Sequence, residues 1–322
     1  NAYAAPWTFE PPMTVSEDPA GRSFFHLEAA GRKSIAVSGG WVAVVWEDNR
    51  SGRSQCYLAL KPPRAKLFNP AMVISGDQEA FQPTVLGLGD GKFALAWEEA
   101  GKILLRPASA QGLGSTTVLS EQGAQASLSA SGNQLFAAWS EQTKSAAQIY
   151  VARLKRDAKA TRLQVTGAHA VETGVVQGDQ TFPSIYSVSA HALMVAWEDR
   201  REGHTRILAA ASRDGGRRFA ATQEVNETSW RGQQAGFGRG TGVMRVALSG
   251  DGRGGIAAVW ADKRDFLAGY DVYAAFASAK NLTFKTNEKV QDEFGNDIAQ
   301  WHPAIAASKG PGPVVAWDDD RD

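Results

Sequence analysis

Six short apolar runs that each end in tryptophan recur along the chain, and this repeat limits what the chain can fold into. The runs include "WVAVVWEDNR" and "LMVAWEDRR". The tryptophans are Trp46, Trp97, Trp139, Trp197, Trp260 and Trp317. In several units a charged turn and a second apolar run, such as "CYLAL" or "DVYAAF", follow the tryptophan. Because one such unit is too small to bury its own apolar face, neighbouring units must stack on one another.

The apolar runs have the composition of β-strands. They are rich in Val, Ile, Ala and aromatic residues, and clusters of Gly, Asp, Asn and Ser bound them. The 33 glycines suit many tight turns, because glycine adopts positive φ at little cost. Six units of about four strands predict an all-β, six-bladed β-propeller, forming a single domain over residues 1–322. A pair of β-sandwiches is the alternative, but it gives no reason for the tryptophan to recur at one place.

One turn carries a resemblance to a known family. Residues 212–219, "SRDGGRRF", match the Asp-box pattern S-x-D-x-G-x-x-[FW] through Ser212, Asp214, Gly216 and Phe219. The chain therefore resembles sialidases and the wider group of sialidase-like BNR (Asp-box) propellers. The resemblance implies four-stranded blades in which the Asp box joins the third and fourth strands. Since the polar side chains of such a turn bond to its own backbone, we interpret these four residues as structural.

The two ends of the chain carry complementary halves of a unit. The last unit stops at "WDDDRD", without a second half. At the other end, "FEPPMTV" (9–15) repeats the Phe-to-Val spacing of "FAATQEV" (219–225), and "AYAA" (2–5) echoes "YAAF" (273–276). We therefore predict that N-terminal strands complete the C-terminal blade, which hides the sheet edges of that blade.

Composition restricts the partners and the location. The 34 basic and 34 acidic residues leave no net charge to drive binding to nucleic acid or to an anionic membrane. No apolar run is long enough to span a membrane. The single cysteine, Cys56, borders the strand "YLAL" and is interpreted as a core residue. The start "NAYAAPW" leads us to expect a mature secreted or periplasmic chain.

Charged turns follow the tryptophans and lie, in a propeller, on the face opposite the Asp box. Four of them contain an Asp-x-Arg pair: Asp48 and Arg50, Asp199 and Arg201, Asp262 and Arg264, and Asp319 and Arg321. We interpret each pair as an ion pair that fixes its turn. The alternative is a ring of carboxylates and guanidinium groups that holds an acidic or polyhydroxylated ligand.

Two connections between units, residues 226–242 and 291–303, are not repeated and are therefore better candidates for function. Their candidate binding residues are Trp230, Arg231, Phe237, Arg239, Trp301 and His302. Aromatic side chains beside Arg and His are suited to a sugar or a peptide. The five histidines are scattered without metal spacing, so no metal site and no cofactor are expected. Calcium is left open, because "DDDRD" is acidic but lacks the alternating ligands of a calcium loop.

The resemblance does not extend to the sialidase active site. That family uses three arginines, a Tyr–Glu nucleophile pair and an Asp acid/base, and its first arginine stands in an Arg-Ile-Pro stretch. Here Arg32 lies outside such a stretch, Gln55 and Cys56 stand where an acid/base is expected, and nothing marks Tyr270 or Tyr273 as a nucleophile. We therefore predict a non-catalytic binding or scaffold module with a protein or carbohydrate partner. The alternative is an exo-acting glycoside hydrolase of the sialidase type.

Overall fold

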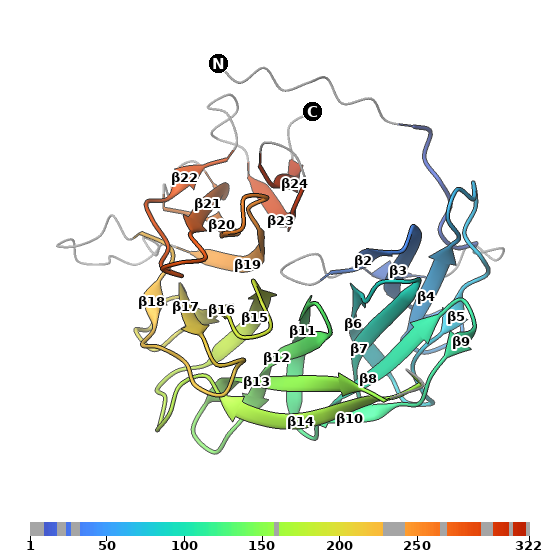
Figure 1. Cartoon of the computed structure of the whole chain (residues 1–322), viewed down its shortest axis with the longest axis horizontal. Helices are drawn as coiled ribbons and strands as arrows, with labels where there is room; N and C mark the ends of the chain where they lie inside the picture. The colour runs from blue at the N-terminus through green and yellow to red at the C-terminus, as the bar shows by residue number, and fades with distance from the viewer. Residues whose placement is uncertain are drawn as a thin grey trace.

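The structure is an all-β propeller of six blades. It is a computed structural model that describes residues 10–17, 24–26, 33–157, 161–227, 242–264, 269–290, 299–308 and 312–319. Within these ranges all regular secondary structure is β-strand. The strands form six antiparallel sheets that follow one another around a common centre (Figure 1). The sequence-based prediction of the fold is confirmed. No helix in the described ranges is long and apolar enough to cross a membrane.

The strands run through the blades in chain order. The first blade contains β1 (Phe25–His26), β2 (Ile35–Ser38), β3 (Trp41–Asp48), β4 (Gln55–Lys61) and β5 (Met72–Val73). The second contains β6 (Ala80–Gly87), β7 (Lys92–Glu99), β8 (Lys102–Ser109), β9 (Gly112–Leu113) and β10 (Thr117–Ser120). The third contains β11 (Gly123–Ser131), β12 (Gln134–Gln142), β13 (Ala147–Arg156) and β14 (Leu163–Ala170).

The remaining blades follow the same pattern. The fourth contains β15 (Gln180–Ser187), β16 (Leu193–Asp199), β17 (Arg206–Ser212) and β18 (Gln223–Glu224). The fifth contains β19 (Val243–Gly250), β20 (Ile256–Asp262), β21 (Asp271–Ala277) and β22 (Glu288–Lys289). The sixth contains β23 (Gln300–Ala306) and β24 (Val314–Asp319). The repeated tryptophans lie on β3, β7, β12, β16, β20 and β24, here called the second strand of each blade. The strands before them, β2, β6, β11, β15, β19 and β23, are called the first strands and lie nearest the centre (Figure 1).

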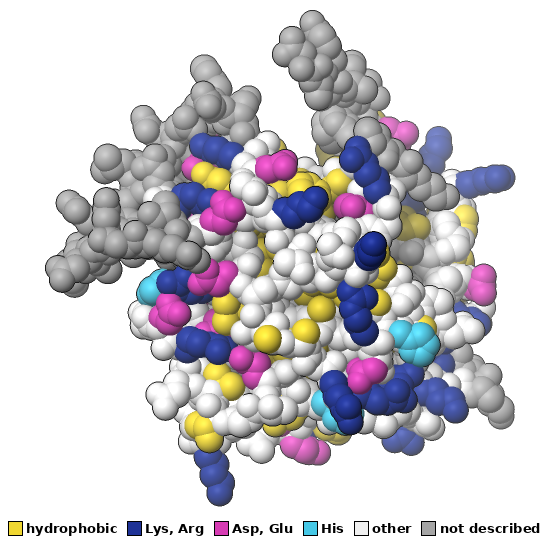
Figure 2. Space-filling view, turned by 60° about the vertical axis from the view of Figure 1, so that its left-hand side comes forward, with side chains coloured by type: hydrophobic (Ala, Val, Ile, Leu, Met, Phe, Trp, Pro, Cys, Tyr) yellow, Lys and Arg dark blue, Asp and Glu magenta, His cyan; other side chains and the backbone are white. Residues whose placement is uncertain are grey.

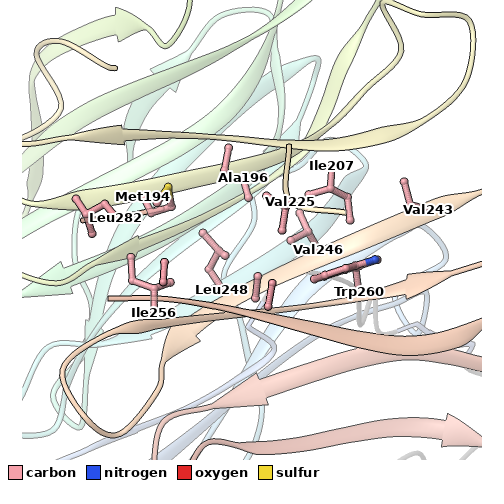
Figure 3. Packing of buried hydrophobic residues seen from close by; sticks show 14 residues of the cluster. Met194, Ala196, Ile207, Val225, Val243, Val246, Leu248, Ile256, Trp260 and Leu282 are labelled. Carbon is pink, nitrogen blue, oxygen red and sulfur yellow. The ribbon is translucent and has the colours of Figure 1, made fainter. Parts of the chain in front are cut away.

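The hydrophobic core lies between the blades. Figure 3 shows one such layer, in which Met194 and Ala196 of β16 pack with Val246 and Leu248 of β19 and with Trp260 of β20. These side chains are almost completely buried. Because the second strands are covered on both faces, they read as continuous apolar runs, and the period-2 alternation of a half-exposed sheet is absent.

The Asp box forms the turn between β17 and β18. The Ser212 hydroxyl donates to Asp214 Oδ1 at 2.9 Å and accepts from the Gly216 amide at 2.9 Å. Asp214 Oδ1 also accepts from the backbone amides that follow it in the turn, the nearest at 3.0 Å. Gly215 and Gly216 have φ values of 76° and 82°, which glycine adopts without strain. Phe219 packs on the core layer between the third and fourth blades.

Residues 15 and 16 contact the first blade in the way that the residues after an outer strand contact the next blade elsewhere in the ring. In the fourth blade, Val225 follows the outer strand β18 and packs in the layer that contains Trp260 of the next blade. Val15 packs in the corresponding way against Trp46 and Tyr57 of the first blade. The residue after this valine matches the third blade, where Glu172 follows Val171 and binds Arg201 of the next blade, because Arg50 Nη2 donates to the Ser16 hydroxyl at 2.8 Å. Residues 15 and 16 thus take the place of the end of a sixth-blade outer strand.

The sixth blade contributes two strands to the described structure. Trp317 of β24 is half-exposed, whereas the other five repeated tryptophans are at most 4% exposed. Ile35 and Val37 of β2, on the side of the first blade toward the sixth, are 61% and 67% exposed. Residues 1–9, which the sequence predicts to supply the missing strands, lie outside the described residues. Trp317 is the side chain that those strands would cover, whereas Ile35 and Val37 line the central cavity.

Deletion of residues 1–16 should therefore lower the melting temperature of the whole ring. The deletion removes the predicted outer strands of the sixth blade and the contact of Val15 with Trp46. Differential scanning calorimetry on the full chain and on chains that start at residues 10 and 17 separates the two contributions. Equal melting temperatures for all three chains would refute the prediction of N-terminal closure.

Candidate functional site

In five charged turns the acidic residue accepts a hydrogen bond from the tryptophan two residues before it. Trp46, Trp197 and Trp260 donate from Nε1 to the carboxylate two residues later, at 2.8, 3.1 and 2.8 Å. The acceptors Asp48, Asp199 and Asp262 are at most 2% exposed. Glu99 and Glu141 accept the same bond from Trp97 and Trp139, at 2.8 and 2.5 Å. The carboxylate is thus buried in four of these five turns and half-buried at Glu141.

The arginine of each turn links its own aspartate to other parts of the blade ring. Arg201 Nη2 lies 2.6 Å from Asp199 Oδ2 and 2.5 Å from Glu172 Oε2, where Glu172 follows the outer strand of the third blade. Arg264 makes the equivalent ion pair with Asp262 at 2.6 Å, and its guanidinium lies over the Tyr273 ring. The Arg201–Glu172 contact links the fourth blade to the third, whereas the two Arg264 contacts lie within the fifth blade.

Of the two remaining Asp-x-Arg pairs, the structure describes one completely and the other only at its aspartate. Arg50 Nη2 lies 2.6 Å from Asp48 Oδ2, and the Arg50 guanidinium lies over the Tyr57 ring at 4.6 Å. Asp319 is the last residue of β24 and is half-exposed. Arg321 lies outside the described residues. Their interpretation as ion pairs that fix each turn stays a prediction for the pair of Asp319 and Arg321, and a ring of these groups that holds a ligand stays the untested alternative.

A repeated bulge in the innermost strands shapes the entrance on this face. Five residues there have positive φ although none is glycine: Gln82, Gln125, Phe182, Arg245 and His302. Each lies where the pairing register of its first strand shifts against the second strand. The sequence analysis missed this feature, because no fixed residue type marks it. The bulge places one variable side chain per blade at the same level of the ring.

Carboxylates of one blade hold the bulge of the next. Glu98 Oε1 accepts from the Gln125 amide at 2.6 Å, and Glu198 Oε1 accepts from the Arg245 amide at 2.8 Å. Glu198 is 3% exposed, and its Oε1 also lies 3.7 Å from Arg245 Nη1. The Arg245 guanidinium covers the Phe182 ring, 3.5 Å from its centroid. Blades four and five therefore present an arginine, an aromatic ring and a buried carboxylate together.

Tyr270 joins the two connections that the sequence analysis selected. Its ring lies 4.7 Å from the Trp301 ring, at an interplanar angle of 42°. Its hydroxyl lies so close to Gly242 that an added Cβ would stand 2.7 Å from it. Gly242 is the last residue of connection 226–242, and Trp301 belongs to connection 291–303. The ends of both connections thus meet at Tyr270, a residue to which the sequence analysis gave no role.

The environment of Tyr270 disfavours its ionisation. Burial raises the pKa of the Tyr270 hydroxyl, and the negative charges of Glu198 and Asp262 raise it further. Lys263 lies over the same ring, with its ammonium 5.7 Å from the centroid. At neutral pH Tyr270 is therefore a neutral phenol that can donate one hydrogen bond.

His302 carries a carboxylate partner beside Trp301. Its Nδ1 lies 2.8 Å from Asp318 Oδ2, and both side chains are exposed. Trp301 and Tyr270 are half-exposed. Trp230, Arg231, Phe237 and Arg239, the other candidates from the sequence, lie outside the described residues, so their binding role stays a prediction.

A cavity of about 620 Å³ opens along the centre of the ring. It is lined mainly by aliphatic side chains of the innermost strands, such as Val85, Leu248 and Ile305. Ser184 and Tyr186 are among its few polar side chains. None of Tyr270, Trp301, His302 and Arg245 is among the residues that line it. Within the described residues no group of three His, Cys, Asp or Glu side chains could hold a metal ion.

Comparison with known proteins places the fold. No family model and no curated protein sequence matches the chain. Among solved structures, a mutant of the NanB sialidase from Streptococcus pneumoniae matches with a TM-score of 0.53 at 9% identity, over 91% of this chain and 65% of that chain. The chain thus has the sialidase-like propeller fold.

Two further structures match less closely. The α-L-arabinofuranosidase Arb93A from Fusarium graminearum, in complex with an iminosugar inhibitor, matches with a TM-score of 0.49 at 12% identity, over 74% of both chains. A Hadza microbial sialidase matches with a TM-score of 0.45 at 10% identity, over 85% of this chain and 60% of that chain.

Asp199→Asn should destabilise the protein at neutral pH by about 2 kcal/mol, because it weakens the buried bonds to Trp197 and Arg201. Burial alone would raise the pKa of Asp199, but hydrogen bonds from Arg201 and Trp197 outweigh burial and lower it. A lowered pKa contributes stability that is present above the unfolded value, roughly 4, and is lost as pH falls through the folded value.

Urea unfolding from pH 7 to pH 2.5 measures this contribution. The difference in unfolding free energy between the wild type and Asp199→Asn should shrink at the acidic end of the range. A difference that stays constant with pH would contradict a role for the ionised carboxylate.

Proposed function

We propose that the protein is a carbohydrate-binding propeller that recognises a glycan at the entrance formed by blades four to six. The observation that carries this proposal is the pair of half-exposed rings, Tyr270 and Trp301, beside the exposed His302–Asp318 pair. Aromatic faces accept the C–H side of a sugar ring, while imidazole, carboxylate and phenol groups bind its hydroxyl groups.

Arg245 gives the proposed site a cationic group. The guanidinium lies over the Phe182 ring and 3.7 Å from Glu198. This fixed position suits a ligand that carries a carboxylate or sulfate, because such groups take guanidinium hydrogen bonds in a planar fork. The candidates of connection 226–242, Trp230 and Arg239 above all, would extend the site from Gly242 outward.

Hydrolysis of a glycoside is the second candidate function. It is favoured by the closeness of Tyr270 to the charge of Glu198, since the sialidase resemblance implies a Tyr–Glu nucleophile pair. Two observations favour binding over hydrolysis. The pKa of Tyr270 is raised, which makes the reactive phenolate rarer, and Glu198 Oε1 already accepts a hydrogen bond from the Arg245 amide.

Trp301→Ala should weaken glycan binding by at least about tenfold, because it removes one of the two stacking rings. A glycan array identifies the ligand, and isothermal titration calorimetry measures its affinity for each variant. Phe81→Ala is the matched control, because Phe81 opposes Glu98 in the second blade as Trp301 opposes Asp318 in the sixth. Equal affinities of the Trp301→Ala and Phe81→Ala variants would refute this placement of the site.

Tyr270→Phe separates binding from hydrolysis. We expect no release of a fluorogenic leaving group from sialosides or other glycosides by the wild type, and modestly weaker binding by the variant. Release by the wild type that the Tyr270→Phe substitution abolishes would instead identify a glycoside hydrolase.

A further inference from the structure

The chain has no net charge, but its Lys and Arg side chains are distributed unevenly over the surface of the ring. The turns that join first to second and third to fourth strands share one face of the ring, here called the Asp-box face. On blades three to five the described cations of this face include Lys155, Arg156, Arg213, Arg217, Arg218 and Lys280. None of the described ion pairs joins one of these cations to an acidic side chain.

The acidic side chains of the same turns are used locally. Asp157 accepts from the Thr161 amide at 2.6 Å, Asp214 from the Arg218 amide at 3.0 Å, and Asp251 from the Gly255 amide at 2.7 Å. These carboxylates are outnumbered by the cations around them. Figure 2 shows many Lys and Arg side chains on the right-hand half of its view. The Asp-box face is therefore a cationic surface on a protein without net charge.

A groove of about 470 Å³ lies on this face between the Asp box of the fourth blade and residues 281–283 of the fifth. Its two walls are bonded to one another. Arg213 Nη2 donates to the Lys280 carbonyl at 2.5 Å, and Gln223 Nε2 donates to the Leu282 carbonyl at 2.8 Å. The Gln223 side chain also accepts from the Phe284 amide at 2.9 Å. The groove is thus preformed, which lowers the entropic cost of binding.

The groove combines cationic donors with neutral polar groups. Arg213 and Arg218 line it together with Asp214, Asn281 and Thr283. Arg218 is exposed, and its guanidinium has no hydrogen-bond partner among the described residues. Guanidinium groups bind carboxylate or sulfate, while the amide, the hydroxyl and the carboxylate exchange hydrogen bonds with sugar hydroxyl groups. A polyhydroxylated anion matches this set better than a bare anion does.

We propose that this groove binds one acidic sugar unit of an anionic polysaccharide, with the carboxylate or sulfate of that unit on Arg213 and Arg218. The neighbouring cations of the Asp-box face would then contact further acidic units along the polymer. A nucleic acid fits less well, because strands of nucleic acid stack their bases on exposed aromatic rings, and Phe219 of the groove packs on the core. The site lies on the opposite face from Tyr270 and does not depend on the glycan site proposed there.

Binding of polygalacturonate and of dextran sulfate to the full chain tests the proposal, with neutral dextran as the reference. The first polymer carries carboxylates and the second carries sulfates, so the arm that binds identifies the acidic group. We expect a double Arg213→Ala, Arg218→Ala variant to bind at least about tenfold more weakly, with affinity that falls as salt is raised. Arg218→Ala alone should lose several-fold and keeps the Arg213–Lys280 bond between the walls.

The control is a double Lys102→Ala, Lys144→Ala variant, which removes the same charge from turns of the opposite face. It should bind as the wild type does. Asn281→Ala should lose several-fold, because the proposal needs the groove as well as the charge. Four results would overturn the proposal: no binding of either acidic polymer, equal losses in the two double variants, unchanged binding by Asn281→Ala, or equally tight binding of single-stranded DNA.

Discussion

The hydrogen bond from the tryptophan indole to a carboxylate two residues later organises the whole ring. Its partners differ in length, since Asp262 accepts it in the fifth blade and Glu99 in the second. In both cases the carboxylate is buried beside its tryptophan, where an unpaired charge would be costly. Glu99 also accepts from the Gly76 amide in the connection from the first blade, whereas Asp262 also pairs with Arg264 of its own turn. The carboxylate therefore fixes its turn in both blades and, at Glu99, the relation to the neighbouring blade as well. This explains why tryptophan and an acid recur as a pair.

The sequence was sufficient for the repeat, the strand positions and the number of blades, because each depends on local spacing. It was insufficient for the alignment within the innermost strands. The aliphatic residue of the first strand stands three positions after the bulge residue, as Ile185 does after Phe182 and Leu248 after Arg245, but its spacing from the tryptophan does not show that a bulge lies between. A bulge changes the register without a fixed residue type, so no periodicity in the letters reveals it.

The sequence also predicts only part of the candidate site, because contacts between residues far apart in the chain leave no local pattern. Trp301 and His302 stand out in the sequence as unique residues in an unrepeated connection. Tyr270 does not stand out in the sequence. Its place in the proposed site comes from contacts with Gly242 and Trp301, which lie about 30 residues before and after it in the chain. The charge distribution is also not visible in the composition, because a net charge of zero says nothing about where the charges lie. Successive turns of a blade point to opposite faces of the ring, so cations of blades three to five gather on the Asp-box face.

The positive-φ bulges have a consequence for how recognition could vary on this scaffold. A non-glycine residue in this conformation is strained by roughly 1 kcal/mol, and each of the five persists because a neighbouring blade holds its amide or its strand in place. The strain resides in the main chain, and the side chains are used in different ways, since Gln125 accepts from the Phe182 amide at 2.6 Å and Arg245 covers the Phe182 ring. Glutamine, phenylalanine, arginine and histidine all occupy the position. The same main-chain bulge therefore accommodates different side chains, so that neighbouring blades contact one another through different groups at the same level of the ring.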